Sequence, residues 1–336
     1  MRFWRTLGVA VFGVAAAGAA SADDGFQLSL PLVCEPHSTC FVQSYVDLDA
    51  GPGVRDFSCG GATYDGHSGV DFRLLSAASS NAGVAVVAAA DGTIKGVRDG
   101  VPDIFAKDGN ADDIKGRECG NGVLIEHNGG WESQYCHMKQ GSVRVTKGQA
   151  VKRGDRLGDV GFSGKADFAH VHLTVRHDGK VIDPFLPAAI DGACQKDTKA
   201  PTLWTAEVAA KFPYKNGEII GAGFAGEPVG LDALEKDNSN VSPLTPASPA
   251  LLFYGRLINL LAADRVRIVV DGPGGSFIEE LSPPLDRNKA TYVSFAGKKR
   301  HADPWPSGRY EGRVEIVRDG AVVATKLGQI ELKTAQ

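Results

Sequence analysis

The chain has 336 residues, 23% of them charged, and a formal net charge of −4 at pH 7. This mildly acidic balance argues against a nucleic-acid partner. The length is that of about two domains. The 42 glycines and 17 prolines favour many turns and therefore a mainly β architecture.

The amino terminus has the pattern of an export signal. Met1 to Arg5 supplies positive charge, Thr6 to Ala20 is apolar, and Ala20-Ser21-Ala22 matches the small-x-small pattern of a cleavage site. The apolar run is shorter than the roughly 20 residues of a membrane-spanning helix. We therefore predict that residues 1–22 are a signal peptide and that the mature chain is periplasmic or secreted, with no stable membrane span.

Short apolar segments broken by glycine follow, as expected of strands. The segments 122–127 and 132–137 flank Asn128-Gly129-Gly130, which is a hairpin signal. All six cysteines lie beyond the cleavage site, and an even number in an exported chain indicates disulfides. Because the hairpin brings Cys119 and Cys136 to roughly facing positions, we predict a bridge between them. The acidic stretch 100–116 lacks the spacing of a calcium loop and is interpreted as a surface loop.

The composition changes between residues 191 and 249, where proline and small polar residues are concentrated. We interpret residues 196–249 as a linker and the start of a second domain. Residues 250–336 contain alternating segments separated by Gly and Pro turns, which predict an immunoglobulin-like β-sandwich. Residues 23–195 then form the first domain with an N-terminal extension. From position alone, residues 25–60 are a hypothetical inhibitory flap, and the sequence leaves this question open.

Three elements of the first domain carry the residue types of a zinc site. His67 and Asp71 lie four residues apart, and the glycines around them favour a bend that enters a strand, so that an imidazole and a carboxylate converge. His170 and His172 lie in a strand-like segment, where a separation of two directs both rings to one face. His137 closes the second strand of the hairpin. A single histidine in such a loop is more often a surface residue than a ligand, so each element alone is weak evidence.

In combination and in order, these elements resemble the lysostaphin and LytM-type zinc endopeptidases, which share an H-x-x-x-D element, a later H-x-H element and a histidine between them. The segments 89–93 and 148–154 are also similar to the alanine-aspartate-glycine turn and the G-x-x-V-x-x-G run of that family. The resemblance extends over about residues 66–184. It implies that residues 23–195 contain a LytM-type peptidase domain built on an antiparallel β-sheet.

By this resemblance, His67, Asp71 and His172 are the ligands of one zinc ion. His137 and His170 are then active-site histidines that handle protons and do not bind the metal. The sequence departs from the family at Phe168-Ala169, where Gly-Pro is usual, and at Cys136, where a small residue is usual. These changes leave all five polar side chains in place and affect the expected shape of the groove.

The implied function is that of a zinc-dependent endopeptidase that hydrolyses peptide cross-links of bacterial peptidoglycan through a metal-activated water. Peptidoglycan peptides are then the substrate, and a protein regulator is a further partner to consider. The alternative is a non-catalytic LytM-like regulator of other cell-wall hydrolases, against which the retention of all five site residues argues. A third hypothesis is a wall-binding protein built around the carboxy-terminal sandwich.

Overall fold

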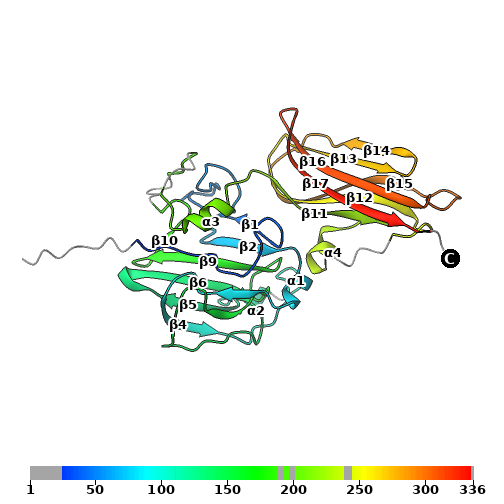
Figure 1. Ribbon diagram of the computed structural model, residues 1–336. Coiled ribbons are helices and arrows are strands. Elements are labelled where there is room, and N and C mark those ends of the chain that lie inside the picture. Colours follow the sequence, from blue (N-terminus) through cyan, green and yellow to red (C-terminus); the bar gives the residue numbers. More distant parts are fainter. Residues whose placement is uncertain (1–24, 110, 188–192, 197–200, 238–243, 334–336) are drawn as a thin grey trace, which may run out of the picture.

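The computed structural model describes residues 25–109, 111–187, 193–196, 201–237 and 244–333, which form two β-rich units (Figure 1). The predicted signal peptide lies outside these residues. Every pairing between the named strands is antiparallel, and the mainly β architecture is confirmed. Within the described ranges, no helix has the length and apolar character needed to cross a membrane.

The first unit is built on an eight-stranded antiparallel sheet. In spatial order its strands are β1 (Cys40–Ser44), β2 (Val70–Leu74), β9 (His170–His177), β6 (Trp131–Met138), β5 (Asn121–Glu126), β4 (Gly92–Arg98) and β7 (Ala150–Val151), with β10 (Lys180–Ile182) paired to β9. A small second sheet and short helices complete it: β3 (Ala85–Val87), β8 (Arg156–Asp159), α1 (Ala77–Asn81), α2 (Ala111–Ile114), η1 (Asn128–Gly130) and α3 (Ala206–Lys211).

Alternation along the central strands β2 and β9 separates an apolar face from a polar one. In β2, Val70, Phe72 and Leu74 belong to the hydrophobic core of the unit. In β9, the core residues are Val171, Leu173 and Val175. Because side chains alternate between faces, the intervening polar residues of both strands share the opposite face. This alternation gathers the predicted site residues on one side of the sheet.

The predicted hairpin is confirmed. Strands β5 and β6 pair antiparallel on either side of η1, where Gly129 has a positive φ of 71°. The bridge between Cys119 and Cys136 is also confirmed, with Cα atoms 4.8 Å apart. Two further disulfides join Cys34 to Cys40 and Cys59 to Cys194.

The second unit is a β-sandwich. Its three-stranded sheet has the order β11 (Glu218–Ala225), β12 (Ala250–Leu260) and β15 (Lys289–Lys299), and its four-stranded sheet has the order β14 (Gly275–Leu281), β13 (Arg265–Gly272), β16 (Gly308–Arg318) and β17 (Ala321–Leu332). Apolar side chains from both sheets form one core, as in Phe253 of β12 and Val314 of β16. The Tyr310 hydroxyl donates to the Pro306 carbonyl at 3.0 Å, in the manner of the tyrosine corner of immunoglobulin-like domains. The predicted immunoglobulin-like sandwich is thus confirmed.

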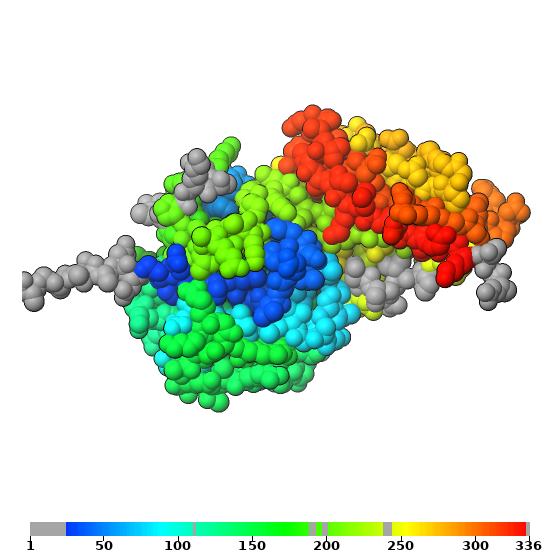
Figure 2. Space-filling model, viewed as in Figure 1, coloured from blue at the N-terminus to red at the C-terminus, as the bar shows by residue number. Residues whose placement is uncertain are grey.

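The two units contact each other directly. Of residues 196–249, α3 belongs to the first unit, whose core includes Val208, whereas β11 and α4 (Leu231–Lys236) belong to the second. Across the boundary, Phe41 packs against Ile220 and Ile258. Asn259 also donates through Nδ2 to a backbone carbonyl of β1 at 3.0 Å. Figure 2 shows this boundary, with the amino-terminal segment in blue lying beside it.

Candidate functional site

Three predicted ligand side chains converge on the polar face of β2 and β9. Asp71 Oδ1 lies 3.1 Å from His67 Nε2 and 2.8 Å from His172 Nδ1, and these two nitrogens are 3.1 Å apart. Asp71 and His172 are register partners on adjacent strands, which explains their proximity. Of the residues that the structure describes, His67, Asp71 and His172 form the group of histidine and acidic side chains whose ligand atoms could hold a metal ion.

Hydrogen bonds on the outer side of the cluster orient the two imidazoles. His67 Nδ1 lies 2.7 Å from the Tyr45 carbonyl oxygen, and His172 Nε2 lies 3.0 Å from Thr174 Oγ1. Because a carbonyl oxygen can only accept, His67 carries its hydrogen on Nδ1 and presents the lone pair of Nε2 to the cluster. A carboxylate oxygen and imidazole lone pairs repel one another unless a cation or a proton lies between them. Two nitrogens and one oxygen are also a donor set that suits zinc, so these residues fit the metal.

His137 and His170 lie beside the cluster. Their rings are 4.5 Å apart between centroids, and His170 Nε2 is 3.6 Å from Asp71 Oδ1. The Nδ1 atom of His137 donates to the Ser163 carbonyl, and that of His170 donates to the Phe168 carbonyl, each at 2.8 Å. Both rings therefore have a fixed tautomer whose Nε2 lone pair is free to accept a proton.

The pKa shifts agree with this division of roles. Burial alone would raise the pKa of Asp71, but the charges of His67 and His170 hold it well below its ordinary value of 3.8. Burial would lower the pKa of His67, yet Asp71 raises it above 6.5. Burial and the charge of His170 hold the pKa of His137 well below 6.5, and burial lowers the pKa of His170. Asp71 therefore favours its ionised form, and burial favours the neutral form of His137 and His170.

Backbone geometry beside the cluster has two special features. His137 has a positive φ of 63°, and its N–H donates to the Cys119 carbonyl at 2.8 Å, next to the Cys119–Cys136 bridge. A Cβ atom on Gly69 would lie 2.5 Å from His172 Nε2 and 2.7 Å from the Leu173 carbonyl oxygen. The bend before β2 therefore requires a residue without a side chain at position 69.

Sequence reasoning missed the groups that orient the imidazoles. Thr174 continues the alternation of β9 beyond His172, and this period-two pattern was a usable signal. The carbonyls of Tyr45 and Ser163 had none, because a backbone group leaves no mark in the sequence. Residues 25–60, considered above as a flap, contribute β1 and the Tyr45 carbonyl that holds His67.

Two other polar side chains of this unit, His127 and Asp103, have structural partners. His127 is buried between the Asp91 carbonyl at 2.6 Å and Ser133 Oγ at 2.8 Å. In the acidic stretch 100–116, the Asp103 carboxylate accepts the backbone N–H groups of Gln140 and Phe162, both at 2.8 Å. These contacts satisfy the side chains without a ligand.

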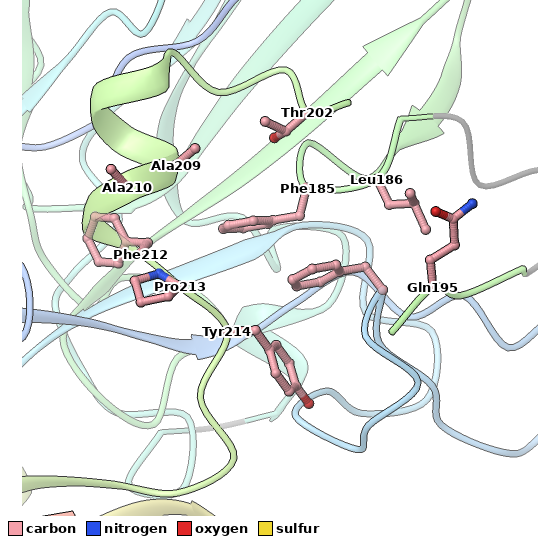
Figure 3. A pocket seen from close by; sticks show the side chains of 10 residues that line it. Phe185, Leu186, Gln195, Thr202, Ala209, Ala210, Phe212, Pro213 and Tyr214 are labelled. Carbon is pink, nitrogen blue, oxygen red and sulfur yellow. The ribbon is translucent and has the colours of Figure 1, made fainter. Parts of the chain in front are cut away.

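A separate cavity of about 300 Å³ lies between α3 and the segment around Phe185 (Figure 3). Its lining is mostly apolar, with Phe185 and Phe212 on its walls and Ala209 and Ala210 of α3 facing it. The Tyr214 hydroxyl on its rim already donates to an Asp56 carboxylate oxygen at 2.6 Å. None of the five site residues lines this cavity, so it is distinct from the cluster.

Comparison with known proteins shows which family and which proteins this chain is similar to. Residues 65–184 match Peptidase family M23. The chain is 36% identical over 73 residues to the cell division protein DipM of Caulobacter vibrioides, covering 20% of this chain and 12% of that protein. It is 34% identical over 64 residues to the peptidoglycan DD-endopeptidase ShyB of Vibrio cholerae, covering 19% of this chain and 15% of that protein.

Among solved structures, the catalytic domain of the antimicrobial peptidase lysostaphin from Staphylococcus simulans is 21% identical, with a TM-score of 0.27. That match covers 42% of this chain and 85% of the lysostaphin chain. The chain spans less than a quarter of the length of the curated relatives that it matches.

Proposed function

From the match of residues 65–184 to Peptidase family M23, we propose that the chain is a zinc-dependent endopeptidase that hydrolyses peptide cross-links of bacterial peptidoglycan. The observation that carries the proposal is the convergence of two imidazole nitrogens and one carboxylate oxygen, all within 4.8 Å of one another. Two neutral histidines beside this group supply the acid-base chemistry that peptide hydrolysis needs.

One zinc ion is held in this proposal by His67 Nε2, Asp71 Oδ1 and His172 Nδ1. A zinc ion with three protein ligands keeps a position for water, polarises a carbonyl and lowers the pKa of water to about 7. The outer hydrogen bonds of His67 to the Tyr45 carbonyl and of His172 with the Thr174 hydroxyl keep the two imidazoles in position, as is usual for metal-binding histidines.

His137 and His170 handle protons in this proposal. One of them accepts the proton of the attacking water at Nε2 and returns it to the leaving amine. The other, if it takes up a proton at Nε2, donates a hydrogen bond to the oxygen on which negative charge develops. The Ser163 and Phe168 carbonyls stabilise either ring when it is protonated, because each accepts the Nδ1 hydrogen in both states.

Peptidoglycan peptides are the proposed substrate, and the periplasm or the cell exterior is the proposed location. The name of the ShyB relative, a peptidoglycan DD-endopeptidase, supports the substrate class. The three disulfides support an oxidising compartment. A protein regulator of the site is compatible with this location.

Zinc analysis and peptidoglycan digestion together test the proposal. The chain without its first 22 residues is loaded with zinc, its metal content is measured, and it is incubated with purified peptidoglycan. We expect one zinc per chain and the release of peptide fragments that mass spectrometry identifies as cleaved cross-links. A protein without zinc that releases no fragments would favour the alternative, a non-catalytic regulator of other cell-wall hydrolases.

A further inference from the structure

A second buried charged cluster lies two residues along β2 from Asp71. Arg73 is fully buried and makes four hydrogen bonds, two of them from Nη2 to Glu235 Oε1 and Oε2 at 2.9 and 2.8 Å. Arg256 Nη2 lies 2.6 Å from Glu235 Oε1 on the other side. The single negative charge of Glu235 therefore lies between two buried guanidinium groups and compensates one of their two positive charges. Glu235 is the central member of the cluster.

Glu235 comes from the second unit of the molecule. It lies on α4, whose Leu234 packs against Ala225 of β11 and Tyr254 of β12. The helix also contacts α1 of the first unit, and Figure 1 shows it at the boundary between the two units. An element anchored on the sandwich thus delivers a carboxylate to a strand that carries a proposed metal ligand.

Arg73 connects this cluster to His170. Its guanidinium carbon lies 4.7 Å from the centroid of the Phe168 ring. The Phe168 ring packs on the His170 imidazole at 4.4 Å between centroids, and the Phe168 carbonyl accepts the hydrogen of His170 Nδ1. The position of Phe168 therefore affects both the packing and the hydrogen bond of His170. Phe168 is also a residue at which the sequence departs from the resemblance described above.

We propose that Glu235 is a positioning residue for His170: through Arg73 it holds Phe168 against the imidazole, so that the sandwich unit fixes the orientation of a group that handles protons. The inference rests on the proposed function for its effect on catalysis. An amide in place of the carboxylate removes the negative charge and leaves Nη2 of Arg73 with one acceptor oxygen where it had two, which weakens the hold of the guanidinium over Phe168. His170 would then lose the support that fixes its ring, while the three metal ligands keep their contacts.

Glu235→Gln tests this inference in the full mature chain. With zinc bound and a purified cross-linked peptidoglycan peptide as substrate, we expect kcat to fall by about tenfold. A proton-transferring group contributes about 10²- to 10⁴-fold, and here it is misoriented but not removed. KM should change by less than about twofold and zinc content should stay the same, because the supported group acts in the transition state. In the zinc-free protein, the ring resonances of His170 should shift or broaden in NMR spectra.

Asp232→Asn is the matched control. It makes the same change of charge on the same helix, and Asp232 also pairs with the first unit, through Lys107, but away from Arg73. We expect it to leave kcat and the His170 resonances unchanged. Unchanged kcat and unchanged His170 resonances in a folded Glu235→Gln protein would overturn the inference, as would an equal effect in the control.

Two further experiments cover the cases in which Glu235→Gln fails to fold or the unaltered chain has no peptidase activity. If Glu235→Gln does not fold, Arg73→Lys takes its place with the same outcomes, because it keeps a buried cation opposite Glu235 and removes the planar group that stacks on Phe168. If the unaltered chain with zinc has no peptidase activity, the proposed function fails. The His170 resonances of the zinc-free variants then decide the inference alone.

Discussion

Strand β2 carries two buried charged side chains on one face, Asp71 and Arg73, and the two surroundings differ in how hydrogen-bonding groups are matched. Around Arg73, N–H donors face the oxygens of Glu235 and Gln43. Around Asp71, a carboxylate oxygen faces ring nitrogens, and the lone pair of at least His67 points inward. In this first, matched set every side-chain nitrogen of Arg73 donates to a protein oxygen. The second, unmatched set needs a cation or a proton between its acceptors. Burial of charge alone therefore does not distinguish the two clusters, whereas the excess of acceptors singles out the candidate functional site.

We expect the largest effect when a residue of the unmatched set, the acceptors around Asp71, is removed. His172→Ala leaves two ligands, and we expect the loss of bound zinc and a fall in activity on the order of 10³-fold or more. Metal analysis and peptidoglycan digestion measure both. His177→Ala, on the same strand but with its side chain 41% exposed, is the control and should retain both. Full zinc content in His172→Ala would contradict the ligand assignment.

A substitution beside the unmatched set distinguishes a loss of proton transfer from a loss of bound zinc. His137→Ala removes a proton-handling ring but no proposed ligand. We expect activity to fall by about 10²- to 10⁴-fold with zinc content unchanged. The same two assays measure it, and a fully active His137→Ala protein would refute the proposed mechanism.

The matched set predicts an effect on stability. Glu235→Ala leaves two buried guanidinium groups without their carboxylate, which we expect to lower the free energy of unfolding by about 3–5 kcal/mol. Asp232→Ala breaks a largely exposed pair and should change it by less than about 1 kcal/mol. Urea unfolding of both variants measures the difference. Equal midpoints would show that the Arg73 cluster adds nothing to stability.

A third buried carboxylate, that of Asp183, has too few hydrogen-bond partners. Its effect should be seen in how the free energy of unfolding depends on pH. Asp183 Oδ1 accepts the backbone N–H groups of Phe185 and Leu186, but Oδ2 is buried without a partner. Burial raises the pKa of Asp183 from 3.8 to about 7. Between these values the native state keeps a proton that the unfolded state has lost, so the free energy of unfolding falls as pH rises from about 4 to 7.

Asp183→Asn should remove this part of the pH dependence. Its amide cannot ionise, and its oxygen can still accept the two backbone hydrogen bonds. We expect the variant to be more stable than the unaltered chain at pH 8, by on the order of 2–4 kcal/mol, and similar to it near pH 4. Urea unfolding at several pH values measures the slope. An unchanged slope would assign the pH dependence to other groups.

Sequence patterns predicted most of the first unit's polar face. The two-residue spacing of His170 and His172 placed both on one face of a strand, and the structure shows their rings beside that of His137. The Asn-Gly-Gly turn predicted the β5–β6 hairpin and, from it, the bridge between Cys119 and Cys136. These features depend on local periodicity and turn chemistry, which a sequence displays directly.

The Arg73 cluster was outside the reach of such reasoning. Arg73 and Glu235 are 162 residues apart, and Glu235 lies on a six-residue helix in a region interpreted as a linker and the start of a second domain. No periodicity connects a strand of one unit to a short helix packed on another. The contact results from the way the two units dock, which only the folded structure reveals.

Gly69 limits how the ligand segment could be engineered. Side chains can be exchanged at many surface positions of a peptidase to change its specificity, but even one methyl group at position 69 would overlap a proposed metal-binding imidazole and a main-chain oxygen of β9. The main-chain oxygen cannot rotate aside as a flexible side chain could. A library that varies the 64–70 bend should therefore leave this position untouched and place its diversity at the neighbouring residues.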